Sequence, residues 1–272
     1  MSGAVVLPGR GWTGRVDRRL GAVLVSAVVL LAVAGPALVT AGPSAQDLSS
    51  ILAPPSAAHW LGTDHLGRSV LSRLVHAARL SILLGCLSVL AAAVVGVGLG
   101  LLAAWRGGAV DTAVTTLADA VLALPGLLLI VLLAAFSDGE LWPLFLGLSL
   151  AMWVEWFRMT RATAAAVIGS RAVEAARLLG FGTGHVLRRH VLPPLMPLFG
   201  TLAAFGLAQA VLAIGALGFI GVGLRPPTAE WGLMMTESLP YYADLPMSMI
   251  APGVCLTLLV LGLQLLAGRR EA

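Results

Sequence analysis

Long apolar stretches separated by polar segments are the main pattern along this sequence. A helix needs about 20 apolar residues to cross a hydrocarbon core of about 30 Å. Six stretches have about this length, at 20–42, 80–104, 111–136, 142–160, 196–222 and 247–267. The pattern therefore predicts an all-α polytopic membrane protein with six transmembrane helices.

These spans divide the chain into parts that differ in polarity. A basic stretch precedes the first span, as in a secretory signal peptide, but the apolar run is longer than the 7 to 15 residues of a signal, so we expect a retained helix. A second domain of five helices follows and contains one polar loop. The expected parts are an N-terminal segment at 1–19, the first helix at 20–42, a segment with an interfacial helix at 43–79, the core at 80–267 with its loop at 161–195, and a tail at 268–272.

Arginine positions predict the orientation of these helices. If the N-terminus is cytoplasmic, 13 of the 17 basic residues fall on the cytoplasmic side. The other four are Arg68, Arg73, Arg79 and Arg225. Short cytoplasmic loops carry an excess of Lys and Arg in membrane proteins. Both termini and the loop at 161–195, between helices 4 and 5, are therefore expected in the cytoplasm, and segment 43–79 in the periplasm.

Composition excludes a soluble protein and argues against a nucleic-acid partner. The chain is 58% hydrophobic and only 11% charged, whereas soluble domains carry about 25% charged residues. Its arginines lie in short clusters between spans and form no basic face of the kind that binds nucleic acid. Membrane lipid is the expected surrounding.

Ionisable residues and prolines inside spans are candidates for a transport pathway. Asp119 lies in the third span, where it either bonds a neighbouring helix, the reading we favour, or contacts cargo. Pro125 interrupts the same span and predicts a kink, which fits a pathway or a packing adjustment equally well. Glu155 precedes Arg158 by three residues on the fourth span, a spacing that favours a local ion pair.

The loop at 161–195 has a pattern of its own. A short amphipathic helix ends at Gly180, a glycine-containing turn follows, and a second short helix is expected to stop at Leu192-Pro193-Pro194. This arrangement predicts a helix-turn-helix knob that projects from the membrane with apolar positions available to a partner.

Six residues of this loop resemble the coupling loop of ATP-binding-cassette (ABC) importer permeases. They are Glu174, Ala175, Ala176, Gly180, Leu192 and Pro193. The resemblance implies that the loop docks on an ATPase subunit and transmits its closure to the membrane helices.

Two further segments, 59–73 and 219–232, are similar to the dipeptide, oligopeptide and nickel subgroup of those permeases. The chain departs from that pattern at Ser69, where an Asp is usual, and at Ile214, where a glutamate is common. The resemblance is nearest to the nickel or metal-chelate branch, with di- or oligopeptide import as the alternative. Histidines and methionines in the outer segments have no spacing that fixes a metal site, so no metal ligand is assigned.

The resemblance also implies partners. A P-loop requires a lysine, and the chain has none, so this subunit is expected to be non-catalytic and to bind no cofactor. ATP and Mg would be bound by two separate P-loop ATPase subunits, beside a homologous second permease and an extracytoplasmic substrate-binding protein. The expected location is the bacterial inner membrane. A secondary transporter working without ATP is a less favoured alternative, because it leaves the loop around Glu174 without a purpose.

Overall fold

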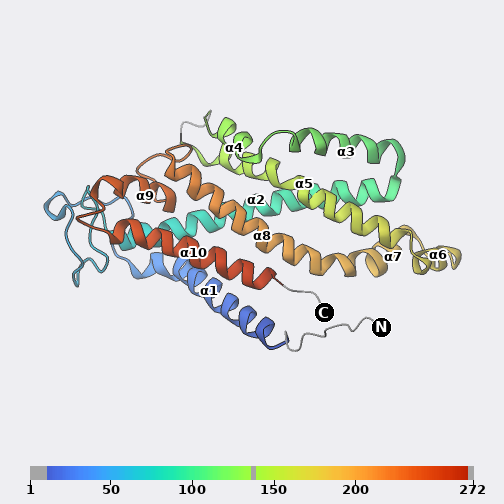
Figure 1. Ribbon diagram of the computed structural model, residues 1–272, viewed down its shortest axis with the longest axis horizontal. Helices are drawn as coiled ribbons and strands as arrows, with labels where there is room; N and C mark the ends of the chain where they lie inside the picture. Colours follow the sequence, from blue (N-terminus) through green and yellow to red (C-terminus); the bar gives the residue numbers. More distant parts are fainter. Residues whose placement is uncertain (1–10, 136–138, 269–272) are drawn as a thin grey trace, which may run out of the picture.

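The computed structural model describes residues 11–135 and 139–268, and most of them are helical. The helices form an elongated bundle (Figure 1). Their bounds are α1 (Gly11–Leu38), α2 (Val70–Arg106), α3 (Gly108–Leu122), α4 (Gly126–Ala135), α5 (Leu141–Ile168), α6 (Arg171–Leu178), α7 (Thr183–Val186), α8 (Leu192–Phe219), α9 (Trp231–Ser238) and α10 (Met247–Ala267). Short turns lie at Leu48–Ser50 and Leu239–Tyr241, and a π-helical turn at Leu187–Val191.

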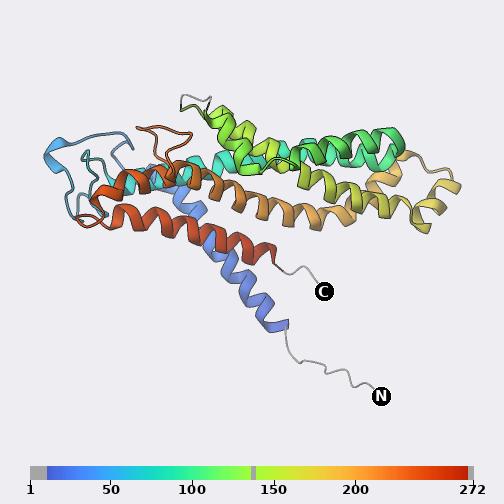
Figure 2. The ribbon, with the colours of Figure 1, turned by 45° about the horizontal axis from the view of Figure 1, so that its top comes forward.

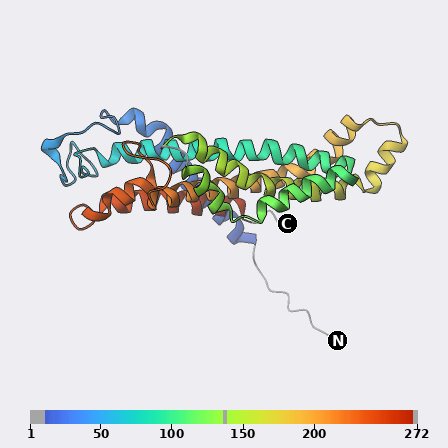
Figure 3. The same cartoon turned by 90° about the horizontal axis from the view of Figure 1, so that it is seen from above.

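The two ends of the bundle differ in construction. At one end lie α9 and residues 39–69, which together we call the cap. At the other end lie α6, α7 and the π-helical turn, residues 171–191, which we call the knob (Figures 1 and 3). The long helices run between the cap and the knob, so a movement at one end can reach the other through them.

Helices α2 and α5 run in the same direction toward the knob and pack closely on each other. Glycines of α2 permit this close approach. A Cβ atom on Gly96 would lie 2.5 Å from the carbonyl oxygen of Trp153 and from the Cβ of Trp156. One on Gly100 would lie 2.9 Å from the Cβ of Thr160. Small residues at helix contacts are a common device of membrane proteins, because van der Waals packing replaces the hydrophobic effect there.

Helices α8 and α10 cover the other side of α2, and α1 packs on α10 and α2. Here too a glycine makes the contact possible, since a Cβ on Gly21 would lie 2.8 Å from the carbonyl oxygen of Gly262. Toward its N-terminus α1 leans away from the bundle (Figure 2). Several apolar side chains of this helix, Val23 and Val33 among them, are exposed. This surface of α1 is apolar enough for lipid or another membrane chain.

The predicted third span is broken, as Pro125 indicated. Helix α3 ends at Leu122 and α4 begins at Gly126, and the two are bent by 75°. Proline lacks the N–H that would continue the helix, and its ring conflicts with the carbonyl four residues earlier. The predicted kink is therefore confirmed.

Within residues 11–135 and 139–268, four helices are long and apolar enough to cross a membrane, and five if the bent pair counts as one span. The single helices are Val16–Leu38, Val70–Arg106, Thr183–Phe219 and Met247–Ala267. Helix α5, which contains the predicted span 142–160, does not meet the same criterion. The fold is thus an all-helical bundle with four or five apolar spans, and the count of six and the position of the termini stay predictions.

One local expectation differs from the structure. The interfacial helix expected within 43–79 is not a separate element, because Val70 begins α2, which continues to Arg106. Val70 and Val75 are 1% exposed and belong to the buried core. The amphipathic pattern of this stretch reflects packing against protein and not a surface helix.

Substitution at Gly96 tests the contact between α2 and α5. We expect Gly96→Val to lower the thermal stability of the detergent-solubilised chain, because the added atoms overlap the backbone of α5. Gly98→Val is the matched control, since a Cβ there meets nothing within 4 Å. Melting followed by intrinsic fluorescence gives the comparison, and equal melting temperatures for the two variants would contradict this packing.

Candidate functional site

The knob begins with a capped helix and a glycine turn. Ser170 caps α6 by accepting a hydrogen bond from the N–H of Val173. Helix α6 ends at Leu178, and Gly180 follows with a φ of +83°. That left-handed conformation costs glycine little and other residues more. The predicted stop at Gly180 is confirmed, and α7 begins after Gly182.

The chain then passes through the two prolines without stopping. In the π-helical turn Leu187–Val191, the N–H of Leu192 donates to the carbonyl of Leu187, five residues earlier. Leu192 and Pro193 lie in the first turn of α8, where Pro193 has no N–H to donate to the preceding turn. The expected proline stop is therefore wrong, and the knob is continuous with a 28-residue helix.

A small hydrophobic core holds the knob on the ends of the long helices. Its buried members come from α5, α6, α7, the π-helical turn and α8, and Trp105 at the end of α2 packs against them. The guanidinium carbon of Arg177 lies 5.1 Å from the centre of the Trp105 ring, a cation–π contact. The buried residues are Ala164, Val173, Ala176, Val186, Val191 and Leu195.

The outer face of the knob is exposed and apolar. Leu178 is 83% exposed and Leu179 is 77% exposed, and Phe181 beside them stacks on His185 with ring centres 4.3 Å apart. Glu174, in the first turn of α6, is exposed as well. Large leucines left uncovered at the tip of a structure indicate a docking surface for another protein.

The six residues that carry the resemblance have different surroundings. Glu174, Ala175, Gly180 and Pro193 are exposed, Leu192 is half-buried, and Ala176 is buried in the core of the knob. Ala176 therefore supports the knob from within, whereas Glu174 and Ala175 are accessible to a partner.

The ionisable residues of the broken span pair with α5. Arg158 donates to Asp119 at 2.5 Å, and Arg161 makes two hydrogen bonds to Asp111. The favoured reading of Asp119, a bond to a neighbouring helix, is thus confirmed. The expected local pair of Glu155 with Arg158 is not formed, because Arg158 turns to Asp119 instead. Two ion pairs therefore join α3 to α5, one in the first turn of α3 and one in its second half, before the kink at Pro125.

A second group of charged residues lies buried at the cap. Asp64 Oδ2 accepts from Arg68 Nε at 2.6 Å and from Arg73 Nη1 at 2.7 Å. Glu237 Oε2 lies 3.1 Å from Arg68 Nη2 and 2.5 Å from Arg73 Nη2. The four side chains are 1% to 12% exposed, and their two positive and two negative charges balance. We call these residues the ionic cluster.

The ionic cluster joins three parts of the chain. Asp64 and Arg68 belong to residues 39–69, Arg73 to α2, and Glu237 to the last turn of α9. Burial alone would raise the pKa of Asp64. Hydrogen bonds from the backbone N–H groups of Arg68 and Leu66 and the neighbouring arginines nevertheless hold its pKa below the usual value of 3.8. The carboxylate is thus ionised and able to bind both arginines.

The start of α9 explains the end of segment 219–232, Glu230-Trp231-Gly232. Glu230 caps α9 by accepting from the N–H groups of Gly232 and Leu233 at 2.9 and 2.8 Å. Trp231 is fully buried and donates from Nε1 to the carbonyl of Leu74 at 3.2 Å. A Cβ on Gly232 would collide with the backbone of Gly215. The motif therefore seats α9 between α8 and α2.

The ionic cluster is not evident from the sequence alone. Asp64 and Arg68 are four residues apart in a glycine-containing loop, which is a local signal for a pair. Glu237 is 169 residues from Arg68 along the chain, so no pattern in one sequence connects them. Among the described residues, no group of three or more His, Cys, Asp or Glu side chains is arranged to hold a metal ion.

Comparison with known proteins identifies relatives along most of the chain. Residues 96–269 match the family described as binding-protein-dependent transport system inner membrane component. A dipeptide transport system permease of Alkalihalophilus pseudofirmus is 30% identical over 93% of this chain and 84% of its own. A probable D,D-dipeptide permease of Escherichia coli is 34% identical over 90% and 82%. A di/tripeptide permease of Pseudomonas aeruginosa is 36% identical over 90% and 83%.

A solved structure has the same fold. An inward-facing form of the MetNI methionine ABC transporter aligns with a TM-score of 0.56 and 19% identity, covering 71% of this chain and 92% of that one. The names of the three relatives above refer to peptides. They give no support to the nickel or metal-chelate branch and favour the peptide alternative.

Removing the charge of Glu237 tests the ionic cluster. Glu237→Gln leaves two buried arginines facing one carboxylate, and an uncompensated buried charge costs about 3 kcal/mol. We expect the melting temperature of the solubilised chain to fall by several degrees. Glu155→Gln, at an exposed position with the same loss of charge, should melt close to the native chain. Equal melting of the two variants would show that the cluster does not stabilise the cap.

The pH dependence of stability tests the surroundings of Glu230, which lies between the spans. Burial raises the pKa of its carboxyl to about 7, against an ordinary value of 4.5. The folded state therefore disfavours the ionised form, and stability should fall as pH rises from about 5 to about 7 and level off above. Glu230→Gln should remove this part of the dependence. The native chain and Glu230→Gln should therefore differ in melting temperature by an amount that changes between about pH 5 and about pH 7. A constant difference would contradict the raised pKa.

Proposed function

The chain belongs to the family of binding-protein-dependent transport system inner membrane components, and on this premise we propose that it forms half of the pathway of an ATP-driven peptide importer. As a permease subunit of this family it is a multi-pass inner-membrane protein without a catalytic role of its own. Peptide cargo is proposed because the relatives are named as di- and tripeptide permeases.

The knob carries this proposal. Its exposed leucines offer a partner an apolar surface at one end of the bundle, and its core joins that surface to α2, α5 and α8. A rigid-body push on α6 would therefore reach three long helices without passing through a flexible linker. This is the property that a coupling element needs, since energy released in one chain must move helices in another.

Charge and topology complete the proposed assembly. With six spans and both termini in the cytoplasm, the knob would face two cytoplasmic P-loop ATPase subunits, which bind ATP and Mg. The cap would face an extracytoplasmic binding protein that delivers the cargo. A homologous second permease would supply the other half of the pathway. We propose that Glu174, Ala175 and Gly180 contribute to the docking surface, and that the kink at Pro125, held by Asp119, shapes the pathway.

ATP hydrolysis by the purified complex in lipid tests the proposed coupling. We expect hydrolysis to rise when peptide-loaded binding protein is added. Glu174→Arg and Gly180→Pro should abolish this stimulation or the assembly, because the first reverses a charge at the contact and the second cannot adopt a φ of +83°. Glu140→Arg makes the same charge reversal at an exposed position outside the knob and should leave stimulation unchanged.

The same assay distinguishes peptide cargo from a nickel chelate, and ATP-coupled transport from transport without ATP. Stimulation by di- or tripeptides but not by a nickel chelate supports the peptide reading, and the reverse result overturns it. If Glu174→Arg and Gly180→Pro assemble and couple as the native chain does, the knob is not the coupling element, and transport without ATP becomes the reading to pursue.

A further inference from the structure

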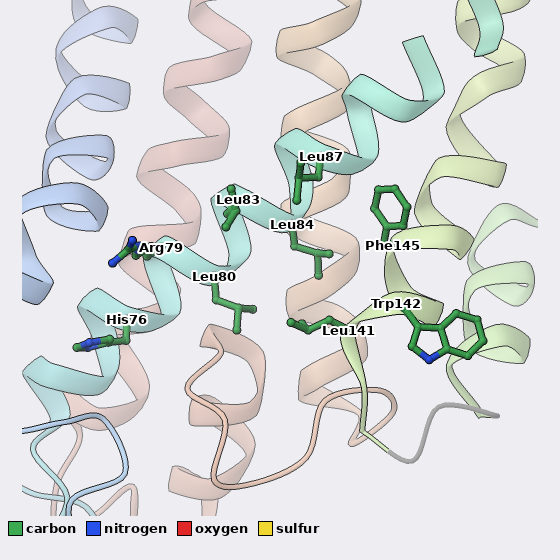
Figure 4. A pocket seen from close by; sticks show the side chains of 9 residues that line it. All are labelled: His76, Arg79, Leu80, Leu83, Leu84, Leu87, Leu141, Trp142 and Phe145. Carbon is green, nitrogen blue, oxygen red and sulfur yellow. The ribbon is translucent and has the colours of Figure 1, made fainter. Parts of the chain in front are cut away.

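An apolar slot opens between the cap-side ends of α2 and α5 (Figure 4). It has a volume of about 550 Å³. Leu83 and Trp142 at its edges are 56% and 54% exposed, so this chain does not close the slot. The lining residues are His76, Arg79, Leu80, Leu83, Leu84, Leu87, Leu141, Trp142 and Phe145.

The polar groups of the slot gather at one end. His76 and Arg79 come from α2 near the cap, and the leucines of α2 extend from them toward the middle of the bundle (Figure 4). His76 Nδ1 lies 2.8 Å from the carbonyl oxygen of Ser72, which holds the ring in place. Of the lining residues that the structure describes, none is acidic. The slot is therefore apolar along its length and cationic at its rim.

Arg79 differs from the arginines of the ionic cluster. Arg68 and Arg73 are buried and bound to carboxylates in the ionic cluster. Arg79 is exposed, and within residues 11–135 and 139–268 no acidic side chain forms an ion pair with it. The Arg79 guanidinium is always charged, lies beside the apolar slot and has no acidic partner among the described residues. It is therefore available to bind an anion from another molecule.

The dimensions of the slot match one leaflet of a bilayer. From His76 to Leu87 α2 advances by 11 residues, which at about 1.5 Å each is about 16 Å. Half of a hydrocarbon core of about 30 Å is about 15 Å. Trp142 lies at the same end as Arg79, and tryptophan and arginine are typical of the level of lipid headgroups. The rim, with Arg79 and Trp142, thus matches the depth of the lipid headgroups. The leucines of α2 match the depth of the lipid acyl chains.

We propose that this slot binds an anionic phospholipid, with its phosphate on Arg79 and one acyl chain between α2 and α5. A peptide fits the lining less well, because its ammonium group would find no carboxylate there and its polar backbone would lie against leucines. A phospholipid presents one anionic group and an apolar chain, in the order that the slot provides. The bound lipid would fill the gap between the two helices that lead to the knob.

Native mass spectrometry of the assembled complex tests the proposal. The complex, purified through a tag on this chain, is exposed to phosphatidylglycerol or phosphatidylcholine, and the lipid retained after delipidation is measured. We expect preferential retention of phosphatidylglycerol, about tenfold weaker binding in Arg79→Ala for loss of a charged hydrogen bond, and partial recovery in Arg79→Lys. Leu83→Trp, which fills the slot, should also reduce retention.

Ile250→Trp is the matched control for Leu83→Trp. Ile250 lies on α10 with 51% exposure and does not line the slot, so its variant should retain phosphatidylglycerol as the native complex does. Equal retention of both lipids, or no effect of Arg79→Ala, would overturn the proposal. So would loss of the second permease in Leu83→Trp, which would assign the slot to the subunit interface, and displacement of the lipid by dipeptides, which would assign it to cargo.

Discussion

Close contact between α2 and α5 is the constraint on which the rest of the structure depends. Gly96 and Gly100 leave no room for a side chain between the two helices, so the helices lie together over the half of α2 that leads to the knob. Lipid tails are as apolar as leucine, and such contacts must therefore be stabilised by fit and not by exclusion of water. One end of α2 carries Arg73 of the ionic cluster, and the other carries Trp105 beneath the knob. This helix links the two ends of the molecule.

Charge is placed where it strengthens that link. The ionic cluster joins residues 39–69 to α2 and α9 with balanced charges, which is the condition under which buried ions are tolerated. The pairs of Asp111 and Asp119 with arginines of α5 join α3, the first part of the broken span, to α5. Arg79 is left for an external anion at the slot. The charges thus organise the ends and the kink, while the middle of the bundle relies on apolar packing.

Local features were predictable from the sequence, and contacts between distant residues were not. The turn at Gly180 and the kink at Pro125 follow from the backbone chemistry of single residues, so their positions were found. The passage through Pro193 was missed because it depends on a π-helical turn formed by the preceding residues. Arg158 has two possible ion-pair partners, Glu155 close by in the sequence and Asp119 far from it. Only the packing of α3 on α5 brings Asp119 to Arg158. For the same reason, the sequence does not indicate that Glu237 lies beside Arg68 and Arg73.

The central claim is that the knob docks on an ATPase subunit and moves with α2, α5 and α8. Hydrogen exchange measured on the complex before and after removal of the ATPase subunits tests it most directly. The account predicts that amides of residues 171–181 are protected in the full complex and exchange faster once the ATPases are removed. Unchanged exchange in this segment, with protection appearing elsewhere on the chain, would contradict the assignment of the knob.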